Sequence, residues 1–317
     1  MEPLLKNADR ADVLVLGRNC LDNLIVVKHY PVEDRKAALI KRHREGGGQG
    51  GTSAACIARL GGRVVLLGHV GDDEAGRFCR ERLRAFGVPV AGVRMVAGGR
   101  TPQAFVIITR GSGKRTIVYE PSELPPIQPD ERFWQLVGQA DLLLLDPETT
   151  YLAHPLQRAR IGRTKIVYDC ERPRAHLDTM MATADYFVPS ADYFRSEMAG
   201  SFNRQRLIQA LLALKPRLKG HLIVTAGSWG AYFVATGAIW HVPAPRVTVV
   251  DTTGAGDNFH GALALALAKG MVLARAVAFG VAVASLSCRG LGGREGLPRW
   301  DEAELLASQL SPRLVYP

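Results

Sequence analysis

The chain has 317 residues, of which 47% are hydrophobic and 22% are charged, and its formal net charge at neutral pH is +10. It holds no apolar run near the ~20 residues of a membrane span, and its first residues (MEPLLKNADRAD) lack the basic region and apolar core typical of a signal peptide, so we expect a cytoplasmic protein without a membrane partner. Its five cysteines include no C-x-x-C pair, so we expect neither a disulfide framework nor a zinc site. The basic residues are mixed with acidic ones and no aromatic cluster accompanies them, which argues against nucleic acid as a partner, although the positive field would attract a nucleoside triphosphate.

The first third of the chain predicts a strand, a glycine-rich helix entry and two strand pairs. Residues 12–17 (DVLVLG) suit a central parallel strand, and Asp22 follows at the sheet edge where α/β folds bind ligands; a plain loop aspartate is the alternative. Residues 46–62 (GGGQGGTSAACIARLGG) predict a turn into an amphipathic helix. The segments 24–45 and 98–121 have the pattern of paired strands, so we expect them to form a small sheet that covers the site.

From residue 130 the pattern changes to repeated strand and helix. Short apolar strands are predicted at 141–146, 165–169, 185–190 and 221–227. Together with the N-terminal strands they imply one mostly parallel sheet with helices on both faces. No long polar linker divides the chain, so we expect residues 1–317 to form a single Rossmann-like, three-layer α/β domain that carries the small sheet as an insertion.

The segment 246–269 (RVTVVDTTGAGDNFHGALALALAK) predicts a strand, a tight turn and a buried helix. The N–H groups of Gly254, Ala255 and Gly256 remain free at the positive end of the helix dipole, so this turn is a candidate anion site. Asp257 stands beside it, where a carboxylate can take a proton from an attacking hydroxyl group, and the pattern therefore predicts phosphoryl transfer. The alternative is that the glycines only fit the turn and Asp257 only complements the dipole.

Three other places are candidates by position. Asp146 and Glu148 follow a predicted strand, where two carboxylates can face a pocket or simply open a helix. Residues 224–230 (VTAGSWG) predict a strand with a glycine turn, for which a plain β-turn is the alternative. His260 lies one turn after Asp257 on roughly the same helix face, as either a core residue or a substrate contact.

Beyond these patterns, DTTGAGD followed by FHGAL resembles the C-terminal signature of the ribokinase-like, PfkB-type carbohydrate kinases, and GGGQGG before ARLGG resembles their N-terminal signature. The resemblance extends from Asp12 to about Pro298; the C-terminal third, with GGREGLP, is similar to the sulfofructose kinases, and ERPRAHL is similar to ketohexokinase. It implies a phosphotransferase with an alcohol group as acceptor, namely an ATP-dependent sugar kinase of ribokinase-like fold with a lid. Asp257 would be its general base and the amides of residues 254–256 its anion hole.

The resemblance also assigns roles to individual residues. It implies that the acceptor sugar is bound by Asp22, Gly47, Gly48, Thr52, Asp146, Glu148 and Asp257. It implies that the nucleotide is bound by Thr225, Gly227, Gly230, Gly254 and Gly256. Asp251 and Thr253 match the place where relatives bind a monovalent cation, for which K⁺ is the candidate.

Three departures from the family pattern refine these expectations. Thr52 stands where ribokinase has the asparagine that touches its sugar, which disfavours ribose. Glu148 stands where ketohexokinase and the sulfofructose kinases carry an arginine, so we expect a neutral or cationic end on a ketose-like, non-sulfonated sugar. Ser190 and Tyr193 replace the Asn-x-x-Glu motif that organises water around magnesium, so Mg²⁺ is expected with ATP but its protein ligands are unknown.

Two other functions remain as alternatives: a nucleoside kinase of the same fold, and a non-catalytic sugar or nucleotide sensor. A nicotinamide-dependent oxidoreductase is disfavoured, because GRNCLD rather than G-x-G-x-x-G follows the first strand. The expected partners are a sugar and ATP, together with a second copy of the chain in a homodimer formed through the lid.

Overall fold

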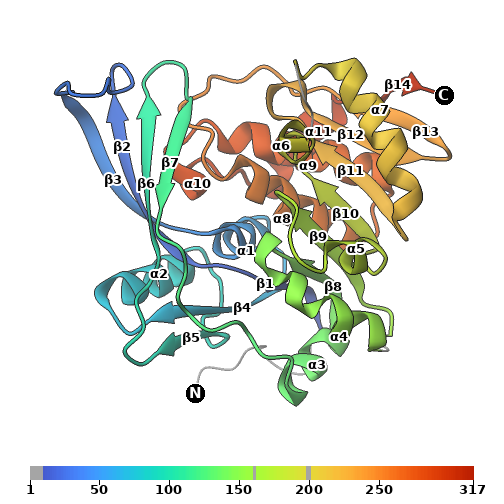
Figure 1. Ribbon diagram of the computed structural model, residues 1–317, viewed down its shortest axis with the longest axis horizontal. Coiled ribbons are helices and arrows are strands. Elements are labelled where there is room, and N and C mark those ends of the chain that lie inside the picture. Colours follow the sequence, from blue (N-terminus) through green and yellow to red (C-terminus); the bar gives the residue numbers. More distant parts are fainter. Residues whose placement is uncertain (1–9, 160–161, 198–200) are drawn as a thin grey trace.

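The computed structural model describes residues 10–159, 162–197 and 201–317, which form a three-layer α/β body from which a small sheet projects (Figure 1). The large sheet has the strand order β14-β13-β12-β11-β10-β9-β8-β1-β4-β5. Its parallel strands are β1 (Ala11–Leu16), β4 (Val64–Gly71), β5 (Val93–Val96), β8 (Ala140–Leu145), β9 (Lys165–Cys170), β10 (Tyr186–Pro189) and β11 (His221–Thr225). This arrangement confirms the predicted mostly parallel sheet with a separate small one.

Three antiparallel strands extend the large sheet beyond β11, and the sequence reasoning did not predict them as part of it. They are β12 (Ala231–Ala235), β13 (Ala238–Val242) and β14 (Arg313–Tyr316). β12 and β13 form a hairpin whose turn contains Thr236 and Gly237, both with positive φ. A tight reversal of this kind pairs successive strands antiparallel, which a helical crossover cannot do.

Alternate side chains of the parallel strands enter two separate cores. Val13 and Val15 of β1 face one core, whereas Leu14 and Leu16 face the other. The first core lies under α1 (Gln49–Arg59), α2 (Glu74–Ala85), α8 (Ala255–Ala268), α9 (Leu273–Ser287) and α11 (Trp300–Ser308), with α10 (Gly292–Glu295) nearby. The second lies under α3 (Glu131–Gly138), α4 (Ala153–Arg158), α5 (Leu177–Met181), α6 (Ala191–Glu197) and α7 (Arg204–Leu214). Because both faces are covered, the central strands are almost continuously apolar.

The small sheet has the order β3-β2-β6-β7 and projects from one end of the body (Figure 1). Its strands are β2 (Cys20–Val27), β3 (Leu39–Gly47), β6 (Gln103–Thr109) and β7 (Arg115–Tyr119). β2 therefore begins before the predicted segment, and Asp22 lies inside this strand. On one face of this sheet, Leu24, Val106 and Ile108 pack together with Leu291 in a small core. Apolar side chains on the other face are exposed.

Parallel strands place all their carboxyl ends along one edge of the large sheet, and the polar side chains discussed next lie along that edge. Short 3₁₀ turns follow two of these strands, η1 (Pro147–Leu152) after β8 and η3 (Gly227–Trp229) after β11, and a third, η2 (Lys215–Arg217), follows α7. Among the described residues, no helix combines the length and the apolar character needed to cross a membrane.

Candidate active site

A tight glycine turn opens α8 at this sheet edge. Gly254 is the N-cap residue in the left-handed conformation, with φ 72°, and no side chain caps the N–H groups that follow it. A Cβ on Gly254 would lie 2.6 Å from the Cα of Gly293, so both its conformation and its space require glycine. Gly256 is exposed and has open space around it. The turn therefore presents N–H groups without side-chain caps at the positive end of a 14-residue helix, which favours an anion. The N–H of Ala255 donates to the carbonyl oxygen of Thr252 at 3.3 Å.

Asp257 stands beside this turn in a half-buried position. Burial raises its pKa to about 7; the Asp169 carboxyl adds to the rise, and His260 opposes it. Ser53 Oγ of α1 donates a hydrogen bond to the backbone carbonyl of Asp257 at 2.9 Å, which fixes the first helical turn. A carboxylate with this pKa is ionised often enough near neutral pH to accept a proton.

The small sheet supplies Asp22 on the acceptor side. Its side chain is 8% exposed, and burial raises its pKa to about 6. Cys20 Sγ donates to Asp22 Oδ1 at 3.2 Å. A Cβ on Gly47 would lie 2.2 Å from Asp22 Oδ2, and a Cβ on Gly48 would lie 2.4 Å from the carbonyl oxygen of Arg18. Gly47 thus allows β3 to approach Asp22, and Gly48 allows the following turn to approach the backbone of Arg18.

Thr52 of α1 is almost completely buried. Its Cγ2 would be 3.1 Å from a Cβ placed on either Gly254 or Gly293, so it lies directly against the glycine turn. In this position Thr52 supports the turn from the α1 side.

Asp146 and Glu148 follow β8 and open η1. Asp146 caps η1, with Oδ1 accepting from the N–H of Glu148 at 3.0 Å and Oδ2 accepting from the N–H of Arg18 at 2.6 Å. Burial outweighs these bonds and raises the pKa of Asp146 to about 6. Glu148 forms ion pairs with Arg18 and, at 3.5 Å, with Arg174. Sequence reasoning missed both arginines, because neither is close to Glu148 in the chain.

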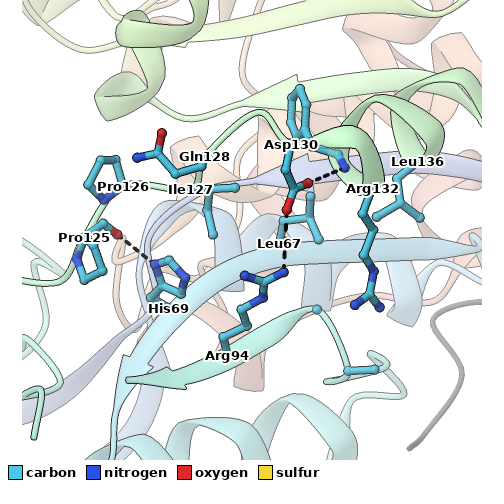
Figure 2. A pocket seen from close by; sticks show the side chains of 13 residues that line it. Leu67, His69, Arg94, Pro125, Pro126, Ile127, Gln128, Asp130, Arg132 and Leu136 are labelled. Carbon is cyan, nitrogen blue, oxygen red and sulfur yellow. Dashed lines mark hydrogen bonds and ion pairs between the residues drawn. The ribbon is translucent and has the colours of Figure 1, made fainter. Parts of the chain in front are cut away.

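Two neighbouring cavities lie on this side of the molecule. The first, of about 190 Å³, is lined by Asp146 and Glu148 and is the candidate acceptor cavity. The second, of about 280 Å³, is bounded by Leu67, Phe133 and the segment that joins β7 to α3. His69 lines both, and its Nδ1 lies 2.7 Å from the carbonyl oxygen of Pro125. Figure 2 shows this contact in the lining of the second cavity, together with Arg94 and its partner Asp130.

The residues predicted to bind nucleotide follow β11. Thr225 ends this strand, Gly227 begins η3 with a φ of 55°, and Gly230 follows η3 with a φ of 94°. A Cβ on Gly230 would lie 2.0 Å from the carbonyl oxygen of Val242, so glycine is required there by close packing. The turn is thereby fixed at the carboxyl edge of the sheet.

The candidate cation site is built around Asp251, which is completely buried. Its Oδ1 accepts from the N–H and the hydroxyl group of Thr253 at 2.9 and 2.8 Å, and its Oδ2 accepts from the N–H of Gly292 at 2.8 Å. Within residues 10–159, 162–197 and 201–317 the salt bridges include no basic partner for this carboxylate. A buried carboxylate without a basic partner fits a bound cation, so Asp251 and Thr253 suit the proposed ion.

Two basic residues that sequence reasoning did not select also contact the site. Arg294 is 1% exposed; its Nη2 lies 3.3 Å from the carbonyl oxygen of Gly47, and its charge lowers the pKa of the buried Asp22. Arg115 of β7 donates to Thr252 Oγ1 at 2.7 Å, which joins the small sheet to the glycine turn. The GGREGLP motif contains Arg294, but nothing in the motif indicates that the side chain reaches β3.

Comparison with known proteins shows consistent similarities over most of the chain. Residues 11–300 match the model of the pfkB family carbohydrate kinases. The chain is 28% identical to ketohexokinase from Mus musculus, in an alignment that covers 91% of this chain and 99% of that protein. It is also 28% identical to aminoimidazole riboside kinase from Salmonella typhimurium, in an alignment that covers 84% of this chain and 88% of that protein. The structure of Arabidopsis thaliana ribokinase complexed with ribose and ATP superimposes with a TM-score of 0.78 at 23% identity, over 94% of this chain and 99% of that one.

Proposed function

Because the chain belongs to the pfkB family of carbohydrate kinases, which are phosphotransferases with an alcohol group as acceptor, we propose that it transfers the γ-phosphoryl group of ATP to a hydroxyl group of a ketose-like sugar. The observation that carries this proposal is the position of Asp257 beside the uncapped turn that begins α8. A base and an anion site side by side are the two elements that phosphoryl transfer to a hydroxyl group requires.

Each residue of the site has its own role in the proposed reaction. Asp22 and Asp146 hold hydroxyl groups of the sugar, since each is a buried carboxylate at the acceptor side of the site. The N–H groups of Gly254, Ala255 and Gly256 receive the γ-phosphate, while Thr225, Gly227 and Gly230 bind the rest of the triphosphate. Asp257 accepts the proton as the hydroxyl oxygen attacks in line, and charge on the transferred group meets the N–H groups of the turn.

The metal ions of the proposal differ in how well the residues fit them. Ser190 and Tyr193 supply no carboxylate, and Tyr193 is buried at 7% exposure, so that position does not fit a protein ligand of Mg²⁺. Mg²⁺ is therefore proposed to bind through the triphosphate, whose charge it neutralises. Asp251 and Thr253 are proposed to bind K⁺ and to hold the glycine turn beside α10.

The acceptor cavity favours a neutral, hydroxyl-rich sugar end over a sulfonate. Glu148 already pairs with Arg18 and Arg174, so it occupies the guanidinium groups that an anionic substituent would need. The ribose-contacting asparagine is replaced by Thr52, which is buried against the turn. A ketose without an anionic group is therefore the proposed acceptor class.

A nucleoside kinase is the second candidate, and one observation favours it. The cavity of about 280 Å³ lies directly beyond His69 and the segment around Pro125, where a base attached to the sugar could extend. The similarity to aminoimidazole riboside kinase is in keeping with this candidate.

The small sheet is proposed to act as a lid and as a dimer interface. Phe105 and Val118 are cross-strand partners on the face opposite Val106, and both are exposed. Leu39, Ile40 and Ile117 are further exposed apolar side chains of the same small sheet. An apolar face of this kind is typical of a surface covered by a second subunit. Light scattering during size-exclusion chromatography would decide between dimer and monomer.

The test of the function is ADP release from ATP and Mg²⁺ with a panel of ketoses, aldoses, amino sugars, sulfosugars and nucleosides. Each acceptor is run with the wild-type protein, with Asp257→Asn, and with Asp301→Asn as a control at an exposed position of α11. Release with ketoses that is lost only in Asp257→Asn supports the proposal. Release with nucleosides alone would favour the second candidate, and ATP binding without transfer to any acceptor would favour a sensor.

A further inference from the structure

The short helix α10 lies where the small sheet joins the body (Figure 1). Leu291, the residue before it, packs in the core of the small sheet, and the N–H of Gly292 donates to Asp251 Oδ2 at 2.8 Å. The carbonyl oxygen of Gly293 accepts from Nδ2 of Asn258, in the first turn of α8, at 2.9 Å. The start of α10 is therefore in contact with both the small sheet and the helix that carries the proposed base.

Arg294 continues this junction towards the acceptor side. Its side chain is 1% exposed, and its Nη2 donates to the carbonyl oxygen of Gly47, at the end of β3, at 3.3 Å. Within the described part of the chain, its Nε and Nη1 are buried without a hydrogen-bond partner. The carboxylate of Glu45 on β3 pairs with Arg82 instead, through both oxygens at 2.7 Å. Burying a charged group with so few partners costs stability, which indicates a role beyond packing.

Two glycines of the GGGQGG segment leave the space that the guanidinium group fills. A Cβ on Gly46 would lie 2.6 Å from Arg294 Nη1, and a Cβ on Gly51 would lie 2.7 Å from Arg294 Nη2. Neither glycine has a positive φ, so the backbone itself would accept alanine at both positions. At Gly46 the next side chain, Arg82, approaches that Cβ position only to 3.4 Å. The guanidinium group of Arg294 is therefore the atom group that requires glycine at position 46.

The same stretch of β3 separates Arg294 from the proposed sugar ligand Asp22. Successive residues of a strand point to opposite faces, so Gly46 faces Arg294 while Gly47 faces Asp22. A Cβ on Gly47 would lie 2.2 Å from Asp22 Oδ2. The hydrogen bond from Arg294 to the carbonyl oxygen of Gly47 thus fixes the backbone against which Asp22 rests.

We propose that Arg294 is a positioning residue for the acceptor: it ties the end of β3 to α10, so that Gly47 and Asp22 keep the arrangement in which the sugar binds. Arg294 acts through the backbone of β3 and does not itself touch the sugar. The effect on turnover rests on the proposed function, whereas the hold of Arg294 on β3 does not.

Kinetics with three substitutions test this role. Arg294→Leu removes every donor, Arg294→Lys keeps one donor for the carbonyl oxygen of Gly47, and Arg289→Leu is the matched control at a half-exposed arginine that pairs with Glu302. With the acceptor found in the panel, Arg294→Leu should raise the KM for the sugar at least about tenfold and leave the KM for ATP within about threefold. The KM of Arg294→Lys should lie between those of the wild type and Arg294→Leu, and Arg289→Leu should match the wild type.

A double-mutant cycle tests the contact itself. Gly46→Ala should raise the KM for the sugar as Arg294→Leu does, because its Cβ would displace the guanidinium group. In the Arg294→Leu background the same alanine should add less than about a twofold change, since the group that it displaces is gone. Effects that simply multiply would show that Gly46 and Arg294 do not act through one contact.

Other outcomes would overturn the inference as well. A wild-type KM for the sugar in Arg294→Leu would remove the positioning role, and an equal rise in the KM for sugar and for ATP would indicate a general loss of structure. If Arg294→Lys were as impaired as Arg294→Leu, the donor to Gly47 would not be what matters. Thermal unfolding monitors the fold, and if Arg294→Leu does not fold, the sugar KM of Gly46→Ala still decides the matter.

Hydrogen exchange measures the hold on β3 without turnover or ligand. Backbone amides of residues 44–48 should exchange at least about tenfold faster in Arg294→Leu and Gly46→Ala than in the wild type and Arg289→Leu, while those of the hairpin 231–242 should not change. Unchanged exchange at 44–48 would overturn the inference. If the wild-type protein phosphorylated nothing in the panel, the proposed function would fail on its own, and the exchange rates would still decide whether Arg294 holds β3.

Discussion

Replacing Asp257 with asparagine separates the chemistry of this carboxylate from its effect on the fold, because the amide keeps the shape and loses the charge. Burial raises the pKa of the wild-type side chain to about 7. A general base acts only when ionised, so kcat/KM of the wild type should fall about tenfold per pH unit below that value and level off above it. The variant should lose at least ~100-fold in kcat while its KM for ATP changes little.

The same pKa shift predicts the opposite effect on stability. Between the ordinary pKa of 3.8 and about 7, the folded protein keeps a proton on Asp257 that the unfolded chain releases. The free energy of unfolding of the wild type therefore decreases as pH rises through this window. A shift of about three units corresponds to at most ~4 kcal/mol, and screening at this half-buried site should reduce it to roughly 1 to 2 kcal/mol.

Asparagine does not ionise, so above this pH window Asp257→Asn should have a higher free energy of unfolding than the wild type, by the difference just given. Below the window the two proteins should differ little in stability. Urea unfolding at about pH 4 and about pH 8 measures both differences, and a coupled ADP-release assay over the same range measures activity. Asp301→Asn, at an exposed position, controls for a general effect of losing one carboxylate. Near-normal turnover in Asp257→Asn would exclude it as the base, and a stability difference that does not depend on pH would refute the assigned pKa.

Three further substitutions test the acceptor side. Gly47→Ala should abolish sugar phosphorylation in the ADP-release assay and leave ATP binding intact, because its Cβ would lie 2.2 Å from Asp22 Oδ2 and displace that carboxylate; retained sugar turnover would contradict this. Glu148→Gln should free Arg18 and raise kcat/KM for anionic sugars relative to that for neutral sugars by about tenfold, or ~1.4 kcal/mol. An unchanged ratio of these two values across a substrate panel would refute the role of Glu148 in excluding anionic sugars. His69→Ala should join the two cavities and raise kcat/KM for sugars with bulky substituents relative to free sugars, with thermal unfolding as the check on the fold.

The parts of this structure that sequence reasoning predicted depend on short-range patterns. The apolar runs that became β1, β8, β9 and β11 are buried on both faces, so their composition alone marks them as central strands. The glycine turn before α8 is likewise encoded within a few residues, because Gly254 needs a positive φ and N–H groups without side-chain caps follow it. The strand β14 was not predicted because it comes from the C-terminus and pairs with β13, far from it along the chain.

The contacts that define the electrostatics of the site could not be predicted in the same way. Glu148 is isolated in the sequence, yet the fold brings Arg18 to it from 130 residues away. Arg294 reaches Gly47 across 247 residues, and nothing near either residue indicates the other. The position of His260 on the helix was predictable from its spacing, but its contact with Asp169 depends on where β9 ends. Side chains that meet through tertiary packing leave no periodic signal in the chain.

The five cysteines have a practical consequence for testing the proposed movement of the small sheet. All are buried as free thiols, and burial raises the pKa of Cys79 to about 12 and that of Cys288 to about 11. Thiolates are the reactive species, so mild alkylating reagents should leave the folded protein unlabelled. A cysteine introduced at the exposed Ser112, in the turn between β6 and β7, could then carry a single fluorophore without prior removal of the native thiols. The native thiols would then contribute no label, so a fluorophore at this position can test whether the small sheet moves as the proposed lid.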